Sequence, residues 1–106
     1  MALTRDFKET VQARVRRDPK FRESLITEAA DCLLSGDVET SKTILRDYIN
    51  ATVGFEKLGE AMHKSPKSLM RMLGKKGNPQ VRNLFPIFAY VQKEEKFKLV
   101  VHPEPA

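Results

Sequence analysis

The sequence predicts an all-α protein, a five- or six-helix bundle that ends in a short C-terminal β-strand. Apolar residues recur every three or four positions through most of the chain, as they do on one face of a helix. Residues that begin or end helices separate these stretches. The chain has 106 residues, 41% of them hydrophobic, which suits one small domain with one core. We therefore expect a single domain over 1–106, with N-terminal helices in 1–52, a central part in 54–93 and a tail strand in 96–102.

Two helices are predicted before residue 35. The first ends near Arg17, and its apolar stripe repeats every four residues at Phe7, Val11 and Val15. Asp18 is a suitable N-cap for the second helix, and Pro19 suits its first turn. The second helix reaches about Leu34, with inner positions at Phe21, Leu25, Ala29, Cys32 and Leu33. Cys32 is expected to be a small buried residue.

A third helix is predicted over about residues 38–52. Gly36 can take the left-handed conformation that ends the preceding helix, and Asp37 can cap the new one. Its inner side is expected to hold Ile44, Leu45, Tyr48 and Ile49. Gly54 closes this helix and opens the central part of the chain.

The central part is predicted to contain two short helices, at about 55–62 and 66–73, joined by a tight polar turn. Ser65 can cap the second helix, and Pro66 suits its first turn. Gly59 is costly within a helix, which predicts close packing at that position. The inward apolar residues are Leu58, Ala61, Met62, Leu69, Met72 and Leu73.

A sixth helix should follow the loop GKKGN and run from Pro79 or Gln80 to about Lys93. Its inner residues are expected to be Val81, Leu84, Phe85, Phe88 and Val91, although Pro86 interrupts the helix. The alternating tail KFKLVVH favours a strand with Phe97, Leu99 and Val101 on one face. That strand would pair with its own copy in a dimer or with a strand of another protein. The alternative is a tail that packs loosely over the helices.

Positive charge is concentrated on the central part of the chain. Residues 53–83 carry two acidic and seven basic side chains, the latter being Lys57, Lys64, Lys67, Arg71, Lys75, Lys76 and Arg82. This excess equals the net charge of +5 of the whole chain. A local cationic face on two short helices is typical of proteins that bind nucleic acid.

The outward face of the second short helix has side chains suited to reading DNA. Arg71 can donate two hydrogen bonds to guanine, Ser68 can reach base edges or phosphate, and Met70 can contact a thymine methyl group. Lys67, Lys75 and Lys76 can hold the phosphate backbone. The alternative is a charged, solvated surface without a ligand.

The central residues resemble the Cro/C1-type helix-turn-helix family. The resemblance rests on Leu58-Gly59, the cap Ser65, the apolar Leu69 and Met72, and the loop GKKGNP. Over nearly the whole chain the sequence resembles, more narrowly, the HigA-like probable addiction-module antidotes, also called DNA-binding prophage proteins. The phrases LTRDFKETVQARVRRDP, ILRDYINATVGFEKLGEA and KSPKSLMRMLGKKGNP carry this likeness.

The resemblance implies an antitoxin that neutralises a RelE-like toxin, binds a palindromic operator as a homodimer and represses its own operon. It adds Ser65 to Lys67, Ser68 and Arg71 as implied DNA contacts. His63 occupies the turn position usually held by glycine, so we expect a positive φ there. Lys64 and Leu73 are further departures from the family pattern.

Other classes of function find little support in the sequence. His63 and His102 stand far apart in unlike contexts, no metal-ligand or nucleophile motif is present, and Cys32 has no basic neighbour. We expect no enzyme activity, no cofactor and no metal. Without a signal peptide or a long apolar run, a cytoplasmic location without membrane contact is expected. Two alternatives remain: a prophage-type repressor without a toxin partner, and a protein-interaction module that no longer reads DNA.

Overall fold

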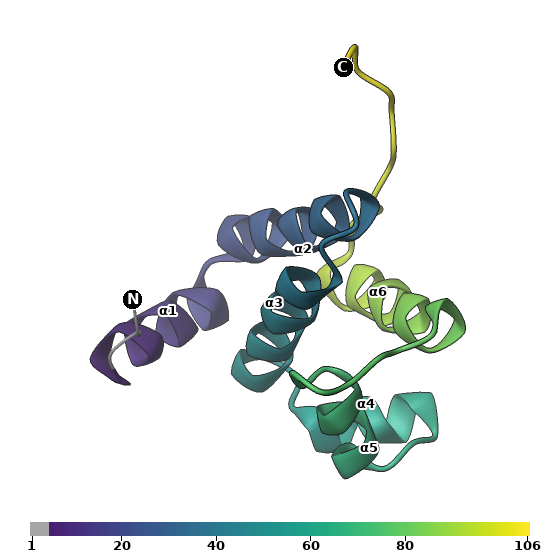
Figure 1. Ribbon diagram of the computed structural model, residues 1–106. Helices are drawn as coiled ribbons and strands as arrows, with labels where there is room; N and C mark the ends of the chain where they lie inside the picture. The colour runs from purple at the N-terminus through teal and green to yellow at the C-terminus, as the bar shows by residue number, and fades with distance from the viewer. Residues whose placement is uncertain (1–4) are drawn as a thin grey trace.

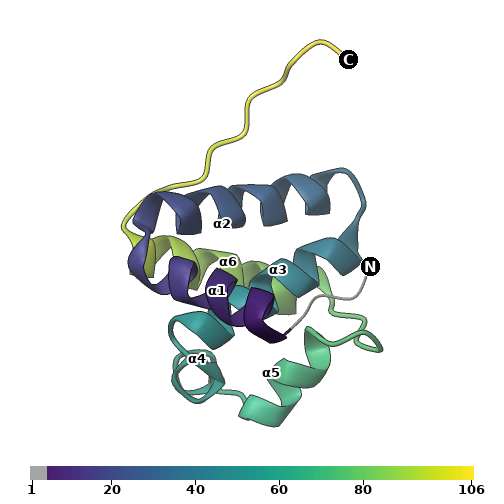
Figure 2. The ribbon, with the colours of Figure 1, turned by 90° about the vertical axis from the view of Figure 1, so that its left-hand side faces the viewer.

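Six α-helices form the part of the protein that the computed structural model describes, which is the backbone of residues 5–106 and the side chains from Glu9 onward. Their bounds are α1 Arg5–Arg17, α2 Pro19–Leu34, α3 Val38–Ala51, α4 Phe55–Met62, α5 Pro66–Met72 and α6 Val81–Glu95. The helix α2 lies at one end of the molecule and the pair α4 and α5 at the other, with α3 between them (Figures 1 and 2). The all-α prediction is confirmed.

Side chains that were predicted as caps fix several helix ends. The carboxylate of Asp18 accepts the backbone N–H of Phe21 at 3.1 Å, and that of Asp37 accepts the N–H of Thr40 at 3.1 Å. Gly36 has a φ of +91°, as its place after α2 predicted. These capping bonds satisfy donors that a helix N-terminus leaves free, so they set where α2 and α3 begin.

All six helices contribute to one hydrophobic core. Its centre is α3, whose Leu45 and Ile49 are almost fully buried. The other buried apolar residues are Val15, Ile26, Ala29, Tyr48, Ala51, Phe55, Leu58, Leu69, Leu73, Leu84, Ile87, Phe88 and Val91. Because α4 and α5 share this core, their positions are fixed relative to α3.

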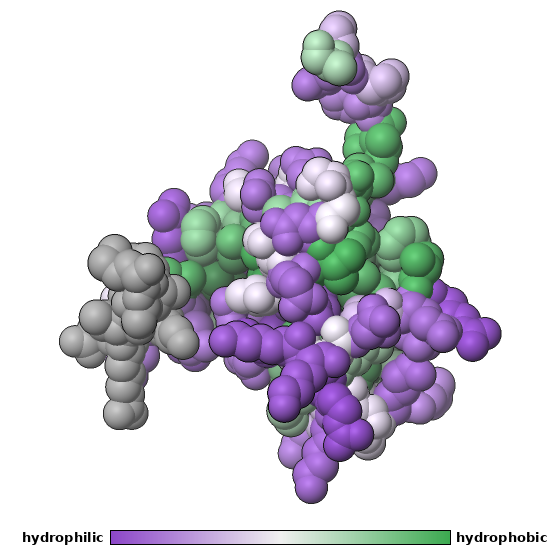
Figure 3. Space-filling model, in the orientation of Figure 1, coloured by the Kyte–Doolittle hydropathy of each residue, from purple (hydrophilic) through white to green (hydrophobic). Residues whose placement is uncertain are grey.

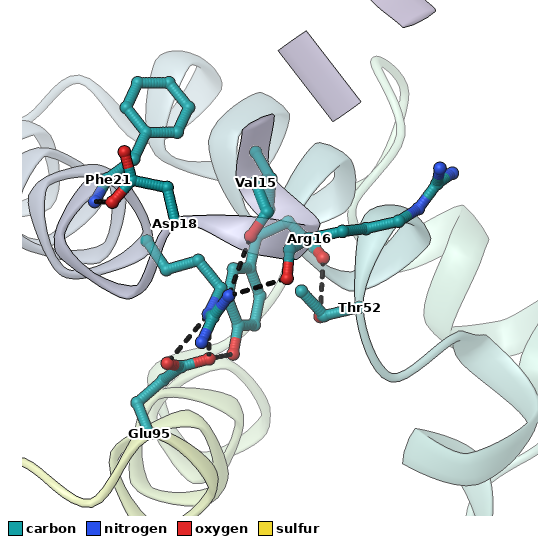
Figure 4. Close-up of polar contacts among 8 residues, drawn as sticks. Val15, Arg16, Asp18, Phe21, Thr52 and Glu95 are labelled. Atoms are coloured by element: carbon teal, nitrogen blue, oxygen red, sulfur yellow. Dashed lines mark hydrogen bonds and ion pairs between the residues drawn. The ribbon is translucent and has the colours of Figure 1, made fainter. Parts of the chain in front are cut away.

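A polar cluster around Glu95 ties four helices together (Figure 4). Arg22 donates to both carboxylate oxygens of Glu95 at 2.9 Å and to the carbonyl oxygens of Val15 and Arg16 at 2.9 and 3.0 Å. The hydroxyl of Tyr48 also donates to Glu95. Burial, followed by this hydrogen bond, raises the pKa of Tyr48 above its usual value of 10.0. The cluster therefore joins the end of α1 to α2, α3 and α6.

The predicted C-terminal strand at 96–102 is wrong for this structure. Lys96 takes a left-handed conformation with φ 59° and ends α6. The chain then leaves the body without strand pairing among the described residues (Figure 1). Phe97 and Leu99 pack against the core, and the N–H of Leu99 donates to Gln92 Oε1 at 2.8 Å. An alternating pattern needs a partner strand, and the described part of the chain has none to offer.

Several predicted inner positions also need correction. In α6, Val81 is 64% and Phe85 51% exposed, whereas Ile87 is buried although it was not predicted to be. Ala61 is exposed and Cys32 only half-buried. The predicted apolar contact of Phe7 lies outside the described side chains.

Candidate nucleic-acid interface

The turn between α4 and α5 has a backbone shape that its sequence explains. His63 has φ 57° and ψ 43°, the left-handed conformation expected for it. Gly59 lies against the turn, because an added Cβ would stand 2.6 Å from the carbonyl oxygen of Lys64. The close packing expected at Gly59 is thus confirmed, and it brings the start of α5 against α4.

The helix α5 is held by one side and exposed on the other. Ser65 Oγ accepts the backbone N–H of Ser68 at 3.1 Å, which confirms the predicted cap. Leu69 and the adjoining Leu73 are 1% exposed and anchor the helix in the core. The exposed residues include every candidate DNA contact, namely Ser65, Lys67, Ser68, Met70, Arg71, Lys75 and Lys76.

An open groove lies between α5, the following loop and the start of α6. We call it the basic groove, and it is lined by Lys64, Ser68, Arg71, Met72, Lys76, Gly77, Asn78, Pro79, Gln80, Arg82 and Asn83. Four of these side chains are cationic and none is acidic. Within the described part of the chain, no ion pair involves any of the four. Their charge is therefore available to a polyanion.

The loop that forms one wall of the basic groove is anchored from below by Lys42 of α3. The Lys42 side chain is 2% exposed, and its Nζ donates to the carbonyl oxygens of Gly74 at 2.9 Å and Gly77 at 2.6 Å. The third partner of the Lys42 ammonium group is Glu39, which has a carboxylate oxygen 2.8 Å from Nζ. Gly77 itself packs tightly, since a Cβ there would stand 2.3 Å from the Arg71 carbonyl oxygen.

A second groove is apolar and adjoins the first. We call it the apolar groove, and it is lined by Ala30, Leu33, Leu34, Val38, Pro79, Val81, Leu84, Phe85, Phe88, Ala89, Gln92, Leu99 and Val101. None of these residues is charged, and Pro79 belongs to both grooves. Hydrophobic surface gathers between α2, α6 and the base of the tail, whereas the end formed by α4 and α5 is hydrophilic (Figure 3).

The predicted site residues fall into two groups. Ser68, Arg71 and Lys76 line the basic groove, whereas the other four candidates are exposed beside it. The prediction missed Lys64, Arg82 and the polar residues Asn78, Gln80 and Asn83 as part of this surface. Arg82 and Lys64 could have been found from the charge excess of residues 53–83, to which both contribute.

Comparisons with protein-family models, with characterised proteins and with solved structures find no match for this chain. No helix in the described residues is long and apolar enough to cross a membrane. The same residues contain no group of three or more His, Cys, Asp or Glu side chains that could hold a metal ion.

Proposed function

We propose that this chain is a sequence-specific DNA-binding transcriptional regulator, in which α4 and α5 act as a helix-turn-helix of the Cro/C1 type. The observation that carries the proposal is the basic groove, with four cations and no acid along the exposed side of a helix anchored in the core. Phosphate contacts supply most of the affinity of such a surface, and side chains at base edges supply the specificity.

The proposed roles follow from where each side chain lies. Ser68, Met70 and Arg71 are exposed on α5, so they would face base edges in the major groove. Lys67, Lys75 and Lys76, with Lys64 and Arg82, would contact phosphates on either side. Ser65 holds the first turn of α5 and would present its backbone to a phosphate.

Binding to the DNA upstream of the protein's own coding sequence tests this proposal directly. Titrations should show tighter binding to that duplex than to a scrambled one of equal length. Arg71→Ala should cost about 1–3 kcal/mol on the specific duplex and much less on the scrambled one. Arg17→Ala removes the same charge from the exposed end of α1 and serves as the matched control. Equal affinity for both duplexes would contradict sequence-specific recognition.

We further propose that the protein binds its operator as a homodimer, with a second copy on the apolar groove. This groove is uncharged in a chain of net charge +5, so two copies can meet there without bringing cations together. It also adjoins the basic groove at Pro79, so that a two-fold pair would carry two α5 helices to one DNA duplex. Paired half-sites would then lie about 34 Å apart.

Sedimentation equilibrium tests the dimer. Phe85→Asp, in the apolar groove, should give monomers. Val100→Asp replaces another exposed apolar residue, one outside the lining of the groove, and should leave the dimer intact. A wild type that remains monomeric both free and on DNA would refute this proposal.

The resemblance to HigA-like antidotes supports a second role, as the antitoxin of a type II toxin–antitoxin module. We propose that the tail binds a RelE-like toxin by adding a strand to its sheet. Val100 and Val101 are 72% and 79% exposed, and the backbone N–H groups of Val100, Val101 and His102 donate no hydrogen bond within the described residues. An extended apolar segment with free backbone donors suits such pairing.

Co-expression with the product of a neighbouring gene tests the toxin role. The two proteins should copurify, and Val100→Asp should weaken that association while Phe85→Asp should not. DNA binding without a toxin partner would favour the prophage-type repressor. Toxin binding without DNA binding would favour the protein-interaction module.

A further inference from the structure

Lys42 is a buried cation that the proposed contacts to DNA do not use directly. It comes from α3, outside the pair α4 and α5, and its Nζ has three partners: the carbonyl oxygens of Gly74 and Gly77 and the carboxylate of Glu39. An ammonium group has three N–H donors, so these partners satisfy all of them. A buried charge is costly without such partners, so the side chain and the loop depend on each other.

The contacts of Lys42 decide which way the loop faces. Its two carbonyl acceptors flank Lys75 and Lys76, and they are turned toward α3. The N–H of Gly77 also donates to the Gly74 carbonyl at 3.0 Å, which closes the loop into a tight turn. The backbone N–H groups of Lys75 and Lys76 have no acceptor among the described residues, and both side chains are exposed. The loop thus turns the carbonyl groups of Gly74 and Gly77 inward and exposes the side chains of Lys75 and Lys76.

We propose that Lys42 is a positioning residue for DNA binding: by holding the carbonyl groups of Gly74 and Gly77 inward, it presents Lys75 and Lys76 to the phosphate backbone of the duplex. This inference rests on the proposed function, because the phosphate belongs to the operator. Lys42 itself is buried and does not touch DNA.

Lys42→Met tests the inference, because methionine is similar in length and apolar. Hydrogen exchange without DNA should show faster exchange of the Gly74 and Gly77 amides in the variant, since these two donate to the carbonyl oxygens of Arg71 and Gly74. On operator DNA, the slope of log K against log salt should fall by about 1–2, as it should for Lys75→Ala with Lys76→Ala. Adding Lys42→Met to that double variant should change the affinity less than twofold. Lys20→Met, the same substitution at an exposed site in α2, should leave the loop and the slope unchanged.

Each other outcome overturns the inference. Unchanged loop exchange would show that Lys42 does not hold the loop, and additive losses of affinity would show that it acts independently of Lys75 and Lys76. If Lys42→Met does not fold, Lys42→Gln, which keeps a shorter donor, takes its place in the same measurements. A wild type that binds no DNA would refute the proposed function, while the exchange measurement would still report whether Lys42 sets the loop conformation.

Discussion

Ser41 and Lys42 are adjacent buried polar residues that differ in whether their side chains have hydrogen-bond partners. Lys42 has a partner for each donor, whereas the hydroxyl of Ser41, which is fully buried, has no hydrogen-bond partner. An unsatisfied buried polar group costs free energy, whereas a hydrogen bond that is formed contributes about 0.5–1.5 kcal/mol to stability. The two neighbours should therefore respond differently to substitution by apolar residues.

Ser41→Ala is expected to leave stability unchanged or to raise the free energy of unfolding by about 1 kcal/mol, because it removes the unsatisfied hydroxyl with little change in volume. Urea denaturation followed by circular dichroism measures this. Thr43→Ala removes a hydroxyl that donates to the Glu39 carbonyl at 3.1 Å, and it serves as a control on the same helix. A clear loss of stability in Ser41→Ala alone would mean that the hydroxyl has a partner in solution.

Helix caps make the stability of α2 and α3 depend on pH. Hydrogen bonding to the backbone of Phe21 lowers the pKa of Asp18, and hydrogen bonding to Thr40 lowers that of Asp37, in both cases below the usual 3.8. A carboxylate with a lowered pKa in the folded state stabilises the fold above its usual pKa. That contribution disappears as the pH falls through the lowered value.

Replacement of both Asp18 and Asp37 by asparagine should therefore make the free energy of unfolding depend less on pH under acidic conditions. Asn still accepts the capping bond but does not titrate. The free energy of unfolding of the double variant should therefore fall less than that of the wild type as the pH is lowered below the usual Asp pKa of 3.8. Thermal melts at a series of pH values measure this. Asp31→Asn, in the last turn of α2 rather than at its N-cap, should behave as the wild type.

The ends of a helix could be predicted from the sequence where the residues that cap it lie next to it in the chain. The bounds of α2 and α4 were predicted because Asp18, Pro19 and Gly54 mark them within a few residues. The inner face of α6 was only partly predicted, because this helix has apolar residues around much of its circumference. Spacing alone cannot decide whether Phe85 or Ile87 faces the core.

The part of the candidate site that lies on α5 was also predictable, since one stripe of the helix is apolar and the other polar. The role of Lys42 was not, because its acceptors Gly74 and Gly77 lie more than 30 residues away in the sequence. The tail has the alternating pattern of a β-strand, but the pattern alone cannot show whether a second strand is present for it to pair with. Gln92 and the core instead hold its first residues.

At the scale of the whole molecule, the cluster around Glu95 connects the N-terminal helices to the last one. Arg22 and Glu95 have side chains that are 18% and 10% exposed, so the pair is largely removed from water. Breaking such a pair leaves one charge without its partner, which costs more than the pair itself contributes.

Glu95→Gln should lower the free energy of unfolding by about 2–4 kcal/mol. The double variant Arg22→Met with Glu95→Leu should lose less than the sum of the single changes Arg22→Met and Glu95→Leu, because it leaves no charge unpaired. Chemical denaturation of the wild type, Arg22→Met, Glu95→Leu and the double variant completes the cycle. Additive losses would show that the two side chains are not coupled in solution.

The free C-terminal end offers a practical site for a fluorescent dye. Residues 102–106 are exposed and lie far from α4 and α5 in both views (Figures 1 and 2). Glu104→Cys would add a thiol there, and desolvation raises the pKa of the native thiol, Cys32, which disfavours its reaction with maleimide. The emission of a dye at 104 should change when a protein partner covers the tail, and it should not change when a DNA duplex binds at the other end of the molecule. A single dye can therefore distinguish the two binding events.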